Sequence, residues 1–291
     1  MEQQIFVSGA TGFQGRPTAQ LLQKKGYTVN TLSPSTKSPK KQEDLRVYPG
    51  SLDSHDALGK ALNGVEKAVF GLPLIFDLEQ AISYTQNFIA TAELAGVRLV
   101  VFNTGFDLPQ NETGLLALDL KIAIAKLFKA SSLKVITLMP DIYIDNLVAP
   151  WSLPLIVQQN IMPYPVPADA LVPWISHNDL ARFTVAALER PELAGQTLPI
   201  GGQLHSGEEI AQAISAHLGK SVDFIPVAPD DFEAQLKDGF GTLAAQEIAN
   251  LYRYVAANLN HLQSKPFTTT QTVLGVTPQS LNEWVNTVKW P

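Results

Sequence analysis

Short apolar runs alternate with segments of helical spacing over the first 139 residues. Residues 4–7 form an apolar run, residues 17–25 carry apolar side chains at helical spacing, and residues 27–32 are apolar and β-branched again. The repeated pattern predicts strands at 4–7, 27–32, 45–48, 67–70, 98–103 and 134–139, with helices at 17–25, 54–62, 78–95 and 115–131. Right-handed crossovers place such helices on alternate faces of the strands. The pattern therefore predicts an α/β fold with a doubly wound parallel sheet.

A glycine-rich segment follows the first expected strand directly, at the first strand-to-helix turn. Residues 8–17 are Ser-Gly-Ala-Thr-Gly-Phe-Gln-Gly-Arg-Pro, with glycines spaced by three. Such glycines permit a tight turn, let backbone N–H groups approach a pyrophosphate, and let the helix start close to the sheet. The segment predicts a dinucleotide site in a Rossmann-type domain. The residues expected to contact the dinucleotide here are Gly9, Thr11, Gly12, Phe13, Gln14, Gly15 and Arg16.

The second expected strand indicates which dinucleotide is bound. NAD sites normally carry an acidic residue at the end of this strand, where it binds the ribose hydroxyls. The sequence between Glu2 and Glu43 contains no Asp or Glu. In contrast, Arg16 and Lys37 flank the place where a 2′-phosphate would lie, and Ser33 could donate a hydrogen bond to it. The sequence therefore favours NADP(H) over NAD(H), although a solvated loop is the alternative reading of the lysine.

The regular alternation fails from about residue 140. Prolines crowd residues 140–173 together with aromatic residues, a composition typical of irregular structure around a cleft. Further on, the pattern predicts a helix at 178–189, a strand near 196–200, and helices at 207–218, 247–262 and 277–288. We expect a nucleotide-binding domain over residues 1–150, to which 174–200 returns. A smaller α+β substrate or partner region would be formed by 151–173 and 201–291.

Composition narrows the function classes. The 291 residues include no cysteine, which excludes disulfides and thiolate nucleophiles, and the histidines lack metal-ligand spacing, so we expect no metal site. The net charge of −6 disfavours direct nucleic-acid binding. No apolar stretch reaches the roughly 18 residues of a membrane span and the amino terminus lacks an export signal, so we expect no membrane association and a cytoplasmic protein. Hydrolase elbows and ATPase phosphate loops are missing from the sequence.

Several further blocks, taken in order with the glycine loop, resemble the NmrA-like family, an atypical branch of the short-chain dehydrogenase/reductase superfamily. The blocks that carry the resemblance are 87–89, 95–97, 101–104, 140–147, 173–180 and 207–211. The resemblance spans nearly the whole chain and implies an NAD(P)-binding protein.

The resemblance also implies roles for individual residues beyond the glycine loop. The residues that would flank the adenine after the third strand are Ser51, Leu52 and Asp53. The residues that would pass the nicotinamide-side ribose after the fourth strand are Gly71, Leu72 and Pro73. Lys121 corresponds to the superfamily's ribose-binding lysine, and its alternative is an exposed cation on an amphipathic helix.

The superfamily usually places a proton-donating tyrosine four residues before this lysine, but position 117 is Ala. The departure argues against ordinary alcohol or ketone chemistry. It favours quinones, nitro compounds, dyes and activated alkenes, because these acceptors are already electrophilic and water can protonate them later. The candidate catalytic residues, which are also candidate cofactor contacts, are Lys121, Thr104 and Tyr143, with Asn146 and His177 as further polar candidates.

Aromatic residues could build an apolar slot for a flat substrate. The candidates are Phe13, Phe106, Trp151, Tyr164 and Trp174. Each polar or aromatic candidate has an alternative: Tyr143 and Trp174 as core aromatics, and His177 as a cap at the start of a helix.

Two functions remain open from the sequence. The first is an NADPH-dependent reductase of a small molecule, such as a quinone or another flat electrophile. The second is a non-enzymatic sensor, in which NADP(H) occupancy changes a surface that binds a protein partner. A third, a sugar-nucleotide epimerase-like enzyme, is opposed by Ala117. The helix at 247–262 is the candidate partner surface, with core packing or a homodimer seam as the alternative, so a monomer and a homodimer are both expected possibilities.

Overall fold

The computed structural model describes residues 3–34 and 44–291 and divides into two compact units. Unit 1 comprises the described residues up to Met139 together with Leu180–Leu198 and Thr272–Val276. Unit 2 comprises Pro140–Asp179, Pro199–Gln271 and Thr277–Pro291. The chain thus leaves unit 1 after Met139, whereas the sequence predicts the boundary at 150. It returns to unit 1 at Leu180, whereas the sequence predicts the return at 174.

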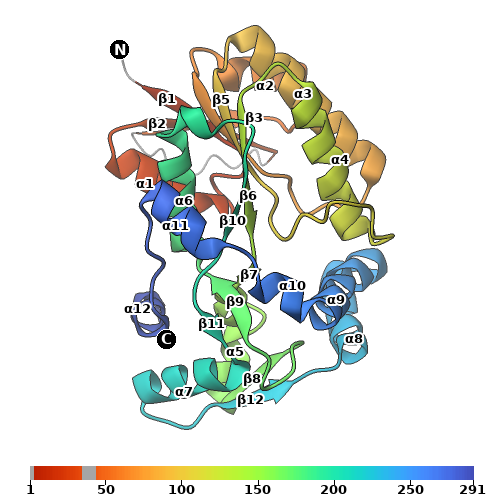
Figure 1. The fold of residues 1–291 in the computed structure, drawn as a ribbon, viewed down its shortest axis with the longest axis vertical. Coiled ribbons are helices and arrows are strands. Elements are labelled where there is room, and N and C mark those ends of the chain that lie inside the picture. Colours follow the sequence, from red (N-terminus) through yellow and green to blue (C-terminus); the bar gives the residue numbers. More distant parts are fainter. Residues whose placement is uncertain (1–2, 35–43) are drawn as a thin grey trace. The chain divides into compact units, whose positions relative to one another are not determined.

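Unit 1 is built on a seven-stranded sheet in the order β10-β6-β5-β4-β1-β2-β3 (Figure 1). The strands are β1 (Gln4–Val7), β2 (Thr28–Ser33), β3 (Leu45–Pro49), β4 (Lys67–Phe70), β5 (Leu99–Asn103), β6 (Val135–Pro140) and β10 (Thr197–Ile200). The pairs β1–β2, β2–β3, β1–β4, β4–β5 and β5–β6 are all parallel. The order runs outward from β1 in both directions, so the predicted doubly wound Rossmann fold is confirmed. Ligands of such sheets bind beyond the carboxyl ends of the strands at this point of reversal.

Helices cover both faces of this sheet. They are α1 (Gly15–Lys24), α2 (His55–Leu62), α3 (Leu78–Ala95), α4 (Leu116–Ala130) and the greater part of α6 (His177–Leu188), followed by the short η2 (Pro191–Leu193). Figure 1 shows α3 and α4 on one side of the sheet and α1 on the other. Local signals set their bounds: Asp77 caps α3 by accepting from Gln80 N at 2.9 Å, and Gly96 ends it at a φ of +78°. No helix in the described ranges is both long enough and apolar enough to cross a membrane.

Phenylalanines fill the space between the sheet and two of these helices. Phe6, Phe70 and Phe102 of the strands meet Phe88 of α3 and Phe128 of α4 in one buried cluster. Ring centroids within it lie 4.6 to 6.2 Å apart. Because β1, β4 and β5 all contribute to this cluster, it fixes the strand ends from which the candidate site is built.

Unit 2 consists of short elements and two small sheets. Its strands and turns are β7 (Ile142–Tyr143), η1 (Ile144–Val148), β8 (Ile161–Tyr164), β9 (Val172–Ile175), β11 (Leu204–His205) and β12 (Asp223–Pro226). Its helices are α5 (Leu153–Gln159), α7 (Gly207–Leu218), α8 (Pro229–Phe240), α9 (Thr242–Ala257), α10 (Leu259–Gln263), most of α11 (Phe267–Leu274) and α12 (Leu281–Thr287). The sheets have the orders β11-β9-β7 and β12-β8. A buried ion pair between Lys265 Nζ and Asp141 Oδ2, at 2.7 Å, ties distant parts of this unit together.

Three expectations for this half of the chain are corrected. Residues 140–173 are not irregular throughout, because they contain α5 and three strands. The helix expected at 247–262 is broken at Asn258, whose backbone leaves the helical region and whose side chain donates to Tyr254 O at 2.9 Å. The last helix begins at Leu281 and not at 277, because Ser280 and Glu283 form a capping box there.

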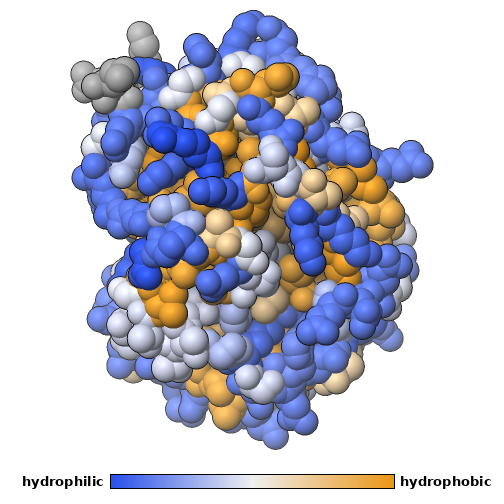
Figure 2. All heavy atoms as spheres, turned by 45° about the horizontal axis from the view of Figure 1, so that its top comes forward, coloured by the Kyte–Doolittle hydropathy of each residue, from blue (hydrophilic) through white to orange (hydrophobic). Residues whose placement is uncertain are grey.

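The expected partner surface on α9 is largely covered. Tyr252 and Val255 are buried, and the ring of Tyr252 packs against Tyr164 and Phe232 of the same unit. Large apolar side chains also reach the surface among hydrophilic ones (Figure 2). Examples are Leu94 of α3, which is 90% exposed, and Leu243 at the start of α9, which is 53% exposed. Core packing therefore accounts for the apolar stripe of α9.

Candidate dinucleotide site

The glycine loop between β1 and α1 has a backbone that excludes larger residues. Gly9 adopts a φ of +66°, and Gly12 N donates to Gly9 O at 2.8 Å, which closes a tight turn. A Cβ on Gly15 would lie 2.3 Å from Gly9 O, a separation that no real side chain shows. Thr11, Gly12, Phe13 and Gln14 are partly or fully exposed around this turn. The cradle fits the diphosphate of a dinucleotide, because glycines at positions 9, 12 and 15 leave the backbone of the loop before α1 without side chains that would keep phosphate oxygens away.

Two hydroxyls that the sequence analysis missed hold this loop. Ser8 Oγ donates to Gly71 O at 2.7 Å and accepts from Gly71 N at 2.8 Å, and Thr31 Oγ1 accepts from Ala10 N at 3.3 Å. The first contact brings Gly71, with the partly exposed Leu72 and exposed Pro73, beside the glycine loop. Both hydroxyls stand out in the sequence as polar residues in or directly after apolar strands, which is the signal that could have found them.

The expected adenine segment follows β3. Ser51 Oγ hydrogen-bonds to the carboxylate of Asp53, which is exposed, while Leu52 is buried. Asn87 of α3 donates from Nδ2 to Leu52 O at 3.2 Å. Ser51 is thus partly exposed and Asp53 exposed, whereas the side chain of Leu52 packs into the core.

The residues expected at a 2′-phosphate lie at the end of β2 and the start of α1. Ser33 is the last residue of β2 and is partly exposed. Arg16 is exposed, and its Nη2 donates to Thr11 O at 2.8 Å, so the guanidinium folds back over the glycine loop. Lys37 lies outside the described residues.

Lys121 lies on α4 with its ammonium turned to the end of β5. Nζ is 3.9 Å from the point that a Cβ on Gly105 would occupy. Burial lowers the pKa of Lys121 to about 8, because the charged form loses hydration. Asp119, on the first turn of the same helix, accepts from Thr113 N at 2.7 Å and from Gly114 N at 3.0 Å. Asp119, which the sequence analysis missed, therefore braces the loop that leads to Lys121.

Thr104 lies at the end of β5 beside Gly105 but is buried. Its Oγ1 donates to Phe106 O and lies 3.3 Å from Leu138 O, so its one proton is directed at backbone carbonyl oxygens. Ala117, four residues before Lys121, is also buried. The hydroxyl of Thr104 is consequently seated to hold the loop rather than to donate a proton.

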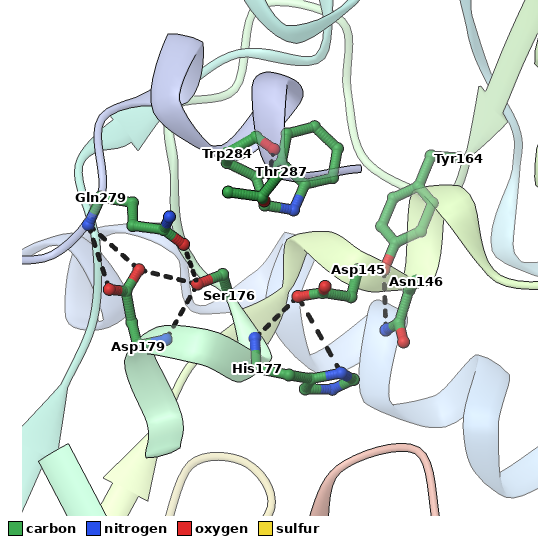
Figure 3. Close-up of polar contacts among 9 residues, drawn as sticks. All are labelled: Asp145, Asn146, Tyr164, Ser176, His177, Asp179, Gln279, Trp284 and Thr287. Atoms are coloured by element: carbon green, nitrogen blue, oxygen red, sulfur yellow. Dashed lines mark hydrogen bonds and ion pairs between the residues drawn. The ribbon is translucent and has the colours of Figure 1, made fainter. Parts of the chain in front are cut away.

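The third candidate catalytic residue, Tyr143, belongs to a polar cluster of unit 2. It is buried, with its ring centroid 4.7 Å from that of His177. His177 N donates to Asp145 Oδ2 at 2.7 Å (Figure 3). Burial lowers the pKa of His177, because the charged imidazolium loses hydration, and this effect exceeds the opposing one of Asp145. The cap of α6 is Ser176, whose Oγ accepts from Asp179 N at 3.0 Å, and not His177 as the alternative reading had it.

The aromatic residues proposed as a slot divide into exposed and buried ones. Phe13 and Trp151 are about half exposed. Tyr164 and Trp174 are buried, with Tyr164 OH 2.6 Å from Tyr252 OH and Trp174 Nε1 donating to His205 O at 3.0 Å. These two rings are therefore core aromatics of unit 2 with satisfied polar tips.

The family model described as the NmrA-like family matches residues 1–285. The chain belongs to the NmrA-like family. The resemblance inferred from the sequence blocks is thereby confirmed, and the family match covers both units.

Known relatives of this NmrA-like chain include oxidoreductases. An NAD(P)H azoreductase of Xenophilus azovorans is 27% identical over 237 residues, 77% of each chain. The triphenylmethane reductase of Citrobacter sp., solved with NADP(H), is 22% identical with a TM-score of 0.78 and covers 97% of this chain and 99% of its own. An NADPH-dependent quinone oxidoreductase of Escherichia coli, solved with NADPH, is 20% identical with a TM-score of 0.76 and covers 97% and 98%. The two structures show that the fold is shared over nearly the full chain.

Proposed function

We propose that this NmrA-like protein is an NADPH-dependent reductase of small, flat electrophiles such as quinones and cationic dyes. The observation that carries the proposal is the cradle in which Gly15 has no room for a Cβ, at the edge of the sheet where Lys121 also lies. The azoreductase, triphenylmethane reductase and quinone oxidoreductase among its relatives support the reaction class.

The proposal gives the glycine loop, the segment after β4 and Lys121 separate tasks. When bound, NADPH supplies a hydride to the acceptor. The amides of the glycine loop bind the diphosphate, and Gly71 to Pro73 pass the nicotinamide-side ribose. Lys121 donates to the ribose hydroxyls, and because its pKa is about 8 it is mainly protonated at neutral pH, where its charge favours negative charge on the reduced acceptor. Thr104 and Tyr143 stay candidates for cofactor contact.

Ala117 determines which acceptors are suitable. A ketone needs a proton on its oxygen as the hydride arrives, and Ala117 has no group that could supply it. A triphenylmethane cation takes the hydride at its central carbon and becomes neutral without any proton. A quinone takes the hydride and becomes a hydroquinone anion, to which water adds the proton. These two classes of acceptor are therefore favoured over alcohols and ketones.

The proposal also assigns a preference for NADP(H). Ser33 supplies a hydroxyl at the end of β2 and Arg16 a cation at the start of α1, and the described part of this strand end carries no carboxylate to bind a free 2′-hydroxyl. We expect Arg16→Ala to raise the Kd of NADPH about tenfold, a loss of about 1.4 kcal/mol, while the Kd of NADH stays unchanged. Lys24→Ala, at the far end of α1, is the matched control and should change neither constant.

Oxidation of NADPH and NADH by the purified protein, over a panel of quinones, triphenylmethane dyes, azo dyes and ketones, tests the proposal. We expect turnover with NADPH above NADH, and with dyes and quinones above ketones. Binding of NADPH without turnover of any acceptor would reject the reductase and favour the alternative, a sensor that reports NADP(H) occupancy to a protein partner.

A further inference from the structure

A small, half-open pocket of unit 2 has several polar side chains in its wall. Its volume is about 20 Å³, enough for one water molecule. Most of the residues that line it come from β9, β11, the start of α6 and the segment leading into α12. Its polar lining residues include Ser176, Asp179, His205, Gln279 and Trp284. All of them belong to unit 2, so the cavity is separate from the glycine cradle of unit 1.

Two nitrogen atoms of this wall have no protein partner. Over the described part of the chain, Nε1 of Trp284 and Nε2 of His205 are buried and make no hydrogen bond. Trp284 is 2% exposed. Figure 3 shows its indole nitrogen on the edge of the ring that faces Ser176, which lines the same cavity. Because a buried donor without a partner is costly, the cavity needs an occupant with a hydrogen-bond acceptor.

The rest of the wall determines the class of that occupant. The carboxyl group of Asp179 accepts from Ser176 Oγ at 2.8 Å and from Gln279 N at 3.1 and 3.2 Å, so its oxygens form part of the wall. The oxygens of Asp179 oppose an anion in the pocket, and a cation cannot accept a hydrogen bond from the Trp284 indole nitrogen. An apolar occupant would leave both nitrogens unsatisfied. A neutral oxygen that can accept and donate remains.

We propose that this cavity is the site of one structural water, which accepts a hydrogen bond from Trp284 Nε1 and donates one to His205 Nε2. The histidine is prepared for this role. Its Nδ1 is 3.3 Å from Glu209 Oε2, and since a carboxylate can only accept, Nδ1 carries the proton and Nε2 is left as an acceptor. The water thereby joins α12, near the carboxyl end of the chain, to β11 and holds this helix on unit 2.

A crystal structure of the full chain, with a ¹⁵N NMR measurement of the His205 tautomer, tests the water site. We expect density for one water within hydrogen-bond distance of Trp284 Nε1 and His205 Nε2, and a His205 protonated on Nδ1. In Trp284→Phe this density should be lost. In Trp290→Phe, the matched control whose indole donates to Val285 O at 3.0 Å, it should remain.

Three results would overturn the proposal: a wild-type cavity without water, a Trp284 nitrogen bonded to a protein oxygen, or a His205 protonated on Nε2. If Trp284→Phe does not fold, the two measurements on the wild-type chain still decide.

Discussion

Replacing Gly15 by alanine tests whether the cradle binds the diphosphate. The added Cβ would lie 2.3 Å from Gly9 O, whereas ordinary contact begins at 3.4 Å, so the loop and the start of α1 must separate by about 1.1 Å. A shift of this size breaks at least one charge-assisted hydrogen bond from a loop amide to a phosphate, worth about 1.5–3 kcal/mol. We therefore expect the Kd of NADPH to rise about 10- to 100-fold.

Isothermal titration calorimetry with NADPH measures this Kd. Substitutions of two further glycines give a graded series for the same measurement. A Cβ on Gly12 would lie 3.2 Å from Gly9 O, so Gly12→Ala should weaken binding less than Gly15→Ala. A Cβ on Gly59, within α2, meets nothing within 4 Å. Gly59→Ala should leave binding unchanged and stabilise the fold by about 0.5–1 kcal/mol, because alanine favours the helix.

The order of the three variants is the critical result. Thermal unfolding shows whether each variant keeps its fold, since overpacking alone costs about 1–3 kcal/mol. A folded Gly15→Ala protein that binds NADPH as tightly as the wild type would refute the assignment of the diphosphate to this loop.

Three further predictions concern charge and packing. In the wild type, kcat/KM should fall as pH rises through about 8, where the ammonium of Lys121 loses its proton. Lys121→Met should raise the KM for NADPH and remove this fall. A pH profile unchanged by the substitution would contradict this prediction. The pKa of Lys121 is lower in the folded chain than its ordinary 10.5, so between about pH 8 and 10.5 the folded state binds fewer protons than the unfolded state. The free energy of unfolding of the wild type should therefore rise with pH in this window, and that of Lys121→Met should not. Asp141→Asn should destabilise the fold by about 3–5 kcal/mol in urea unfolding, because it leaves Lys265 buried without its carboxylate; a cost below about 1 kcal/mol would argue against a buried pair. Phe88→Ala should cost about 3–5 kcal/mol in the same assay, and a cost near that of a surface substitution would show that the phenylalanine cluster is not the core.

The fold of unit 1 could be predicted because its signals are local. Its central strands are buried on both faces and read as continuous apolar runs, such as Leu99–Asn103, and the turns between them carry caps such as Asp77 and Gly96. The glycine loop is a contiguous motif, so its position and its restriction to glycine were also predictable.

Unit 2 was less predictable because its short elements depend on partners distant in sequence. β7 has two residues and exists only through pairing with β9, some thirty positions later. The apolar period of α9 continues past its end, so periodicity predicts one helix where the side chain of Asn258 interrupts it. The start of α6 could have been found, since Ser176 and Asp179 have the spacing of a capping box.

The hydrogen bonds that hold the glycine loop depend on the order of the strands in the sheet. Ser8 can bond to Gly71 only because β4 lies beside β1, and Thr31 can reach Ala10 only because β2 lies on its other side. Sequence periodicity contains neither relation, which is why these two hydroxyls were missed while the loop they hold was predicted.

The most direct test of the proposed reductase is a single turnover with NADPH deuterated at the transferred hydrogen and a triphenylmethane dye as acceptor. The account predicts a colourless product with deuterium on its central carbon, formed by the wild-type chain and, at an NADPH concentration between the two Kd values, in a lower amount by Gly15→Ala. A product without deuterium, or no product from a wild-type chain that binds NADPH, would contradict it.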